Sequence, residues 1–177
     1  MCLTTRPAAT ALAATLVLAA TLSAGVARGA GGFNACKALQ ASFDPFWKSK
    51  VLTGPLATSP AVRTFGHAYI CEWAGRRTAE GGFDYGVALN FSPARSAALA
   101  KQNFAHMHAS PKNVKARVAG ADEAYGNQES KGGVTYSTIY FRRSVYTGVL
   151  ATSTPGGERG LLAAQRLLET FLRRVRG

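Results

Sequence analysis

Four side chains that could do chemistry lie close together in the sequence. Cys71 stands in the run "YICEW", His67 precedes it by four residues, Glu72 follows it directly, and Asp84 lies beyond the next turn. A thiol beside an imidazole can act as a nucleophile, and an imidazole paired with a carboxylate can act as a general base. These residue types raise the hypothesis of a small secreted hydrolase that uses His67 with Glu72 or Asp84.

The predicted strands argue against that hypothesis. Segment 63–73 alternates bulky and small side chains, which predicts a strand with His67 and Cys71 on one face and Glu72 on the other. Four residues along a strand span about 13 Å, which is too far for a direct hydrogen bond between His67 and Cys71. Segment 83–91 also alternates and places Asp84 on the Glu72 side. Neither carboxylate then meets His67 across a flat sheet, so we favour a structural role for Cys71.

The sheet face that carries Glu72 also carries the small residues Gly66, Ala68, Gly86 and Ala88, which leave it shallow. Such a face either packs closely against a helix or stays open as a shallow groove rimmed by Glu72, Asp84 and Asn90. An open groove could bind a ligand, and His67 is a further candidate at the mouth of a pocket on the bulky face. The sequence leaves both possibilities open.

The start of the chain has the layout of a secretory signal peptide. Arg6 and the amino terminus are followed by the uncharged apolar run "AATALAATLVLAATLSAGV" and by the small residues "ARGAGG". This layout predicts a signal peptide over residues 1–29 and a single exported domain over 30–177. A retained membrane anchor is the alternative, because the apolar run is nearly long enough to span a bilayer. No later segment is apolar enough to do so.

The cysteine count points to a disulfide. The chain has three cysteines, and Cys2 would be lost with the signal peptide. An exported domain that keeps Cys36 and Cys71 most simply joins them in one bridge. The thiol in "YICEW" is therefore predicted to be oxidised.

Basic residues dominate the charge. Lys and Arg number 21 against 9 acidic residues, a net charge of +12, which falls to +10 when Arg6 and Arg28 leave with the signal peptide (12 − 2). Scattered solvated charges are the simpler interpretation. The sharper one is contact with an anionic envelope polymer or lipid surface through the basic residues of the last predicted helix, which are Arg166, Arg173, Arg174 and Arg176. No nucleic-acid partner is expected. The apolar side of that helix is needed for a core, which favours packing over membrane contact.

Periodicity along the rest of the chain predicts the fold class. We expect α+β architecture with an antiparallel sheet of about five strands, helices mainly on one face, and the order α-β-β-α-β-β-β-α. The expected helices are 34–50, 92–108 with Ser92 as its N-cap, and 159–176; the expected strands are 63–73, 83–91, 114–120 and a hairpin pair within 129–153 that turns at "KGG" and "RR".

Metal and cofactor sites are not predicted. His106 and His108, two apart on a helix, point about 200° away from each other and suit a solvated helix end. Asp122 and Glu123 lie in "VAGADEAYG", which is predicted to be a turn and has too few ligands for calcium. The chain contains no G-x-S-x-G, Walker, Rossmann or zinc pattern.

Three features together carry a family resemblance: Cys36 near the predicted mature start, "CEW" about 35 residues later, and "VAGADEAYG" before two strands and a terminal helix. In these the chain resembles small secreted bacterial proteins and lipoproteins of unknown function. It is also similar in pattern to the extracellular sensor domains of some bacterial Ser/Thr kinases. The resemblance implies an α+β fold with a Cys36–Cys71 bridge and brings no catalytic residues. "FNAC" is a poor lipidation signal, so we expect a free secreted protein.

The leading hypothesis is therefore an exported, non-enzymatic binding or sensor-like domain that acts in the bacterial cell envelope or outside the cell. Its ligand would be a small molecule, an envelope polymer or a partner protein. The hydrolase and the cationic surface binder are the alternatives.

Overall fold

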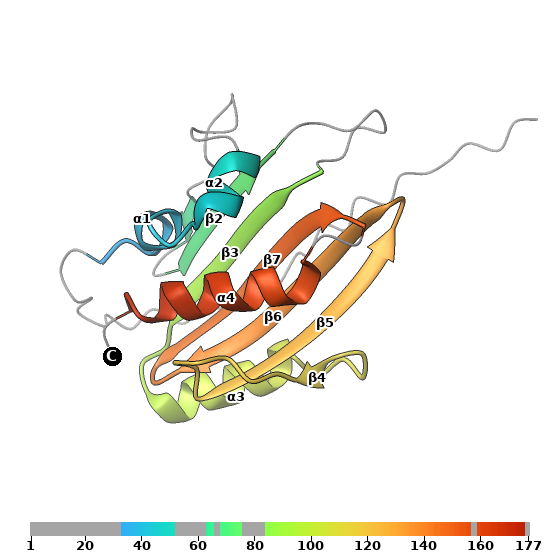
Figure 1. Ribbon diagram of the computed structural model, residues 1–177. Helices are drawn as coiled ribbons and strands as arrows, with labels where there is room; N and C mark the ends of the chain where they lie inside the picture. The colour runs from blue at the N-terminus through green and yellow to red at the C-terminus, as the bar shows by residue number, and fades with distance from the viewer. Residues whose placement is uncertain (1–32, 52–62, 66–67, 76–83, 157–158, 176–177) are drawn as a thin grey trace, which may run out of the picture.

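The computed structural model describes residues 33–51, 63–65, 68–75, 84–156 and 159–175. Within these ranges the chain forms four helices and one antiparallel sheet of seven strands, in the order β1-β2-β3-β7-β6-β5-β4 (Figure 1). The strands are β1 (Arg63–Phe65), β2 (Ala68–Ala74), β3 (Gly86–Pro93), β4 (Val114–Lys115), β5 (Glu123–Lys131), β6 (Val134–Arg143) and β7 (Tyr146–Pro155). The helices are α1 (Ala35–Gln40), α2 (Pro45–Lys50), α3 (Ala97–Met107) and α4 (Gly160–Leu172). The α+β class and the antiparallel sheet are thus confirmed. The expected number of about five strands was too low and the expected order differs, because β1 is separate from β2 and β5 begins before the predicted hairpin.

One face of the sheet, which we call the core face, carries the hydrophobic core. Cross-strand partners share a face, and the register Cys71–Leu89–Leu150–Ile139 runs across four strands with all of these side chains buried. Helix α4 lies along this face in Figure 1 and buries its apolar side there. Phe171 of α4 meets the ring of Phe91 edge-on, with ring centroids 5.5 Å apart.

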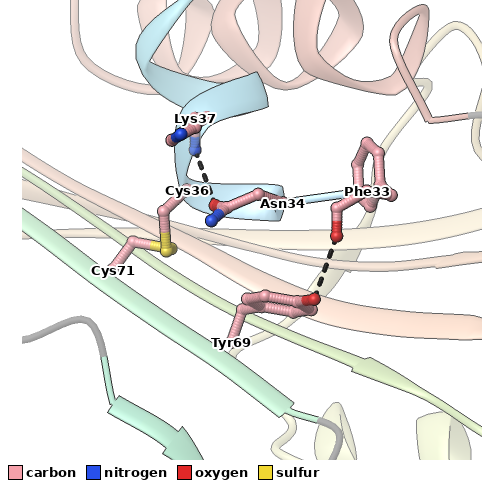
Figure 2. The surroundings of a disulfide bond; sticks show 6 residues. All are labelled: Phe33, Asn34, Cys36, Lys37, Tyr69 and Cys71. Atoms are coloured by element: carbon pink, nitrogen blue, oxygen red, sulfur yellow. Dashed lines mark hydrogen bonds between the residues drawn. A yellow bond between two sulfur atoms is a disulfide. The ribbon is translucent and has the colours of Figure 1, made fainter. Parts of the chain in front are cut away.

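Helices α1 and α2 cover the β2 end of the core face. The predicted disulfide is confirmed: Cys36 of α1 is bonded to Cys71 of β2, with Cα atoms 5.5 Å apart and both side chains buried (Figure 2). The Tyr69 hydroxyl donates to the Phe33 carbonyl oxygen at 2.9 Å. A helix of six residues is too short to persist alone, so these ties and the packing of its apolar side hold α1 in place.

Helix α3 packs on the other side of the sheet, which we call the outer face. Its buried Phe104 lies against Tyr125 of β5, with ring centroids 6.0 Å apart. Gly126, which follows Tyr125 in β5, faces Leu161 of α4. A Cβ atom added to Gly126 would lie 3.4 Å from the Cδ1 atom of Leu161. Neighbouring strand residues point to opposite faces, so α3 and α4 sandwich the sheet. The expectation that helices lie mainly on one face holds for α1, α2 and α4, and α3 departs from it.

The predicted first and second helices needed correction. Segment 34–50 is two helices, because Asp44 caps Trp47 N at 3.0 Å and Pro45 occupies the first position of α2. Ser92 is not a helix N-cap, since it pairs with Thr147 near the end of β3. Ser96 is the cap, and its side chain accepts from Leu99 N at 3.2 Å.

The strand boundaries also differ from the expectation. Segment 63–73 forms two paired strands, β1 and β2, instead of one. The predicted turn "VAGADEAYG" reverses only around Gly120, because β5 already begins at Glu123. The "KGG" turn is confirmed by positive φ angles at Gly132 and Gly133. The "RR" turn is wrong, because both arginines pair within β6 and the reversal falls at Ser144, where φ is 53°.

In the part of the chain that the structure describes, every helix is too short or too polar to cross a lipid bilayer.

Candidate ligand-binding groove

The outer face carries a groove of about 400 Å³ across β2, β3, β7 and β6. Strand register organises its lining into two cross-strand rows. The first row is Glu72–Ala88–Ala151–Thr138, and the second is Ala74–Gly86–Ser153–Tyr136. The groove is therefore a flat depression four strands wide. It lies on the sheet face for which the alternation in the sequence predicts small side chains.

Small side chains make the floor of the groove low. Ala88 and Ala151 contribute only methyl groups, and Gly86 contributes none. A Cβ atom on Gly86 would lie 2.8 Å from the Ser153 hydroxyl oxygen, so this glycine lets the serine sit close to the strand. The floor thus exposes backbone and methyl groups, a surface suited to a flat apolar body.

The sides of the groove are polar. Glu72 is exposed at the β2 side and makes neither an ion pair nor a hydrogen bond with any residue that the structure describes. Tyr136, which is 46% exposed, stands at the β6 side with the hydroxyl group of Thr138 in the neighbouring row. A carboxylate at one side and hydroxyl groups at the other give a ligand two kinds of polar contact.

Helix α3 limits the length of the groove. The next cross-strand row is Ile70–Asn90–Val149–Tyr140, and α3 packs against β6 and β7 beside it. Ala100 and Phe104 are the fully buried side chains of that helix. One part of the outer face is therefore covered by α3, and the small-residue part beyond it is hollow.

The structure separates the residues predicted to rim the groove. Glu72 lines it, Asn90 is exposed one row away, and Asp84 lies before β3 and outside the lining. His67 lies outside the described residues. A Glu72–Asp84 pair therefore does not form one site in the groove, and ligand binding by these residues stays a prediction.

Five of the eight residues in the two rows were not among the candidates from the sequence. One is Ala74 of β2, and the other four are Ala151 and Ser153 of β7 and Tyr136 and Thr138 of β6. Their alternation places them on one face of a hairpin. The signal that was missing is the pairing of β3 with β7, because more than fifty residues separate these strands in sequence.

Arg166 of α4 and Arg173, which follows the helix, are exposed and line a second, smaller hollow of about 260 Å³ together with Ser42 and Asp44. Arg166 and Arg173 line it together with Glu169. Arg174 donates to the Ala41 carbonyl oxygen at 3.0 Å and thereby ties the end of α4 to α1. In the hollow itself, the carboxylates of Asp44 and Glu169 offset the positive charges of Arg166 and Arg173. Arg176 is outside the described residues.

His108 is not the solvated residue that its position at the end of α3 suggested. Its ring stacks on Tyr125 with centroids 3.9 Å apart and an interplanar angle of 12°. Its Nδ1 atom lies 2.6 Å from the Phe104 carbonyl oxygen and donates to it in the matching tautomer. His106 is exposed. Among the described residues no group of three potential metal ligands comes together.

The fold and the groove together define the class of this protein: it is an α+β domain with one disulfide and a partly uncovered sheet face. A scan against protein-family models finds no matching family, and a search of curated proteins finds no significant match. The function must therefore be argued from the groove itself.

Proposed function

We propose that this protein is an exported, non-enzymatic binding or sensor-like domain whose ligand lies in the outer-face groove. The groove between Glu72 and Tyr136 is the observation that carries the proposal, because it is hollow and falls within the usual volume range of about 300–1,000 Å³ for small-molecule sites. The buried Cys36–Cys71 bridge supports an oxidising compartment outside the cytoplasm. The bacterial cell envelope or the space outside the cell is the corresponding location.

The lining suggests the chemical class of the ligand. Ala88, Ala151 and the backbone at Gly86 favour a flat apolar body, since they offer a shallow surface without donors from side chains. The carboxylate of Glu72, which has no partner among the residues that the structure describes, favours a cationic or hydrogen-bond-donating group at one end. We therefore propose a compact amphiphilic small molecule with a planar apolar part and a positively charged or amine-like group.

A binding role is preferred to the hydrolase for a geometric reason. Glu72 lines the groove, whereas Asp84, the other carboxylate of the hydrolase hypothesis, does not. The cationic surface binder is less favoured because Asp44 and Glu169 share the hollow of the α4 arginines.

Two fluorescent dyes of opposite charge test the proposal. Thioflavin T is flat and cationic, and anilinonaphthalene sulfonate is anionic. We expect the purified protein to bind thioflavin T more tightly. Ala151→Phe should weaken binding of both dyes by about tenfold or more, the effect of about 1.4 kcal/mol, because the added ring fills the floor. Glu72→Lys should weaken binding of thioflavin T alone.

Asp84→Asn is the matched control, because it removes a carboxylate near β3 that does not line the groove. Its affinity for both dyes should equal that of the unchanged protein. Equal affinities in all three variants, or no binding of either dye, would contradict the proposed site.

A further inference from the structure

Strand β5 has two edges, one paired with β6 and one that faces β4. Part of the edge that faces β4 has no partner among the described residues. β4 pairs only through Val114 with Gly126 and Lys115 with Tyr125, while β5 continues to Lys131 (Figure 1). Residues 128–131 are all exposed. An unpaired strand edge is a template for pairing with another chain.

The direction of the backbone groups along this edge follows from one hydrogen bond. Ala116 N donates to Ala124 O at 2.9 Å, so Ala124 points its backbone groups away from β6. In an antiparallel ladder this direction alternates, and Gln128 and Ser130 therefore present their N–H and C=O groups at the free edge. These groups are positioned to accept a further antiparallel strand.

We propose that the additional strand is β5 of a second copy of this chain, paired antiparallel about a two-fold axis at Ser130. The two Ser130 residues then exchange a pair of backbone hydrogen bonds. Glu129 of each copy stands opposite Lys131 of the other, which forms two cross-strand pairs of opposite charge. The short sequence Glu129–Ser130–Lys131 is in this sense complementary to itself.

Other registers are disfavoured. Centring on Gln128 would place Ser130 opposite Gly126, whose edge is already taken by β4. Centring on Glu129 or on Lys131 would place like charges directly opposite each other, which is destabilising. The register about Ser130 alone keeps β4 in place and matches the charges.

Two exposed apolar side chains flank this edge. Val114 is 62% exposed and pairs with Gly126, and Leu162 is 53% exposed at the start of α4. Gln128 fixes that start beside β5, because its side-chain oxygen accepts from Leu161 N at 3.3 Å. A two-fold axis perpendicular to the sheet would place both α4 helices on the same face of a joined sheet. Val114 and Leu162 would then add apolar contact beside the hydrogen bonds.

The edge is short, so the dimer should be weak and visible at high protein concentration. Small interfaces of this kind fall at the transient end of the range. Sedimentation equilibrium over a wide concentration series measures it directly. We expect a reversible monomer–dimer equilibrium, with dissociation constants about tenfold or more higher for Glu129→Lys and for Lys131→Glu, because each creates two like-charge pairs.

The double variant that carries both exchanges restores opposite charges and should recover dimerisation. Ser130→Pro should abolish it, because it removes a donor that points outward and takes no part in the ladder with β6. Lys101→Glu on the exposed side of α3 is the matched charge control and should leave the equilibrium unchanged. Circular dichroism of each variant verifies that it is folded.

A protein that stays monomeric at every concentration overturns the proposal. So does a dimer that Ser130→Pro leaves intact, because it must use another surface. Failure of the double variant to restore dimerisation overturns the register about Ser130. None of these outcomes bears on the groove, whose test uses dye binding.

Discussion

Replacing both Cys36 and Cys71 with alanine should lower the free energy of unfolding by about 2–4 kcal/mol. The bridge joins α1 to β2 across a sequence separation of 35 residues. The double replacement removes the cross-link without leaving a free thiol that could pair elsewhere. Alanine also adds no polar group to a site where both side chains are buried.

The magnitude follows from the loop that the bridge closes. In the chain-entropy account a closed loop of about 36 residues is worth about 3.8 kcal/mol, which is an upper figure because unfolded chains retain structure. Helix α1 keeps other contacts when the bridge is lost, including the Tyr69–Phe33 hydrogen bond and the buried side chain of Leu39. The variant should therefore fold with α1 docked and unfold more easily.

Urea unfolding followed by tryptophan fluorescence measures the loss. With a urea dependence of about 2 kcal/mol per molar, typical of small proteins, the midpoint should fall by roughly 1–2 M. The unchanged protein treated with reductant should unfold near the same lower midpoint. If the double variant unfolds at the midpoint of the oxidised protein, the bridge does not stabilise this fold and a chemical role for Cys71 must be reconsidered.

Two further predictions concern single residues of the sheet. Trp73→Ala should cost about 3–5 kcal/mol in urea unfolding, because the indole is buried and meets Phe43 edge-on with centroids 5.2 Å apart; Glu72→Gln, which changes an exposed neighbour, should cost less than about 0.5 kcal/mol. Equal midpoints for the two variants would show that Trp73 does not belong to the core. Gly148→Ala should cost about 1–3 kcal/mol, because its Cβ atom would fall 2.4 Å from the Phe141 ring; an unchanged thermal midpoint would contradict this close packing of ring on backbone.

Local periodicity explains which parts of the fold the sequence could predict. Alternation in 83–91 predicts a strand whose odd-numbered residues lie opposite Asp84, and of these Val87, Leu89 and Phe91 are buried. The last predicted helix was expected to place its apolar side against a core, and Leu168 and Phe171 on that side are fully buried. These patterns depend on neighbours within a few residues, so a single sequence carries them.

Pairings between distant segments could not be predicted in the same way. Whether β3 meets β7, and whether α3 lies on the core face or the outer face, depends on which apolar surfaces remain after the other elements have packed. The sequence predicts the helix that contains α3, but only the structure shows that α3 buries Phe104 against Tyr125 on the outer face. The groove is consequently the part of the site that needed the structure, although its small residues on β2 and β3 were visible in the sequence.

The central claim is that the outer-face groove binds a flat, cationic small molecule. The most direct measurement is a map of backbone amide chemical shifts in the ¹⁵N-labelled protein during titration with thioflavin T. We predict that the largest changes fall on the two cross-strand rows, at Glu72, Ala88, Ala151 and Tyr136, with little change along α4. Changes centred on the α4 hollow at Arg166 and Arg173, or changes spread evenly over the surface, would contradict the claim.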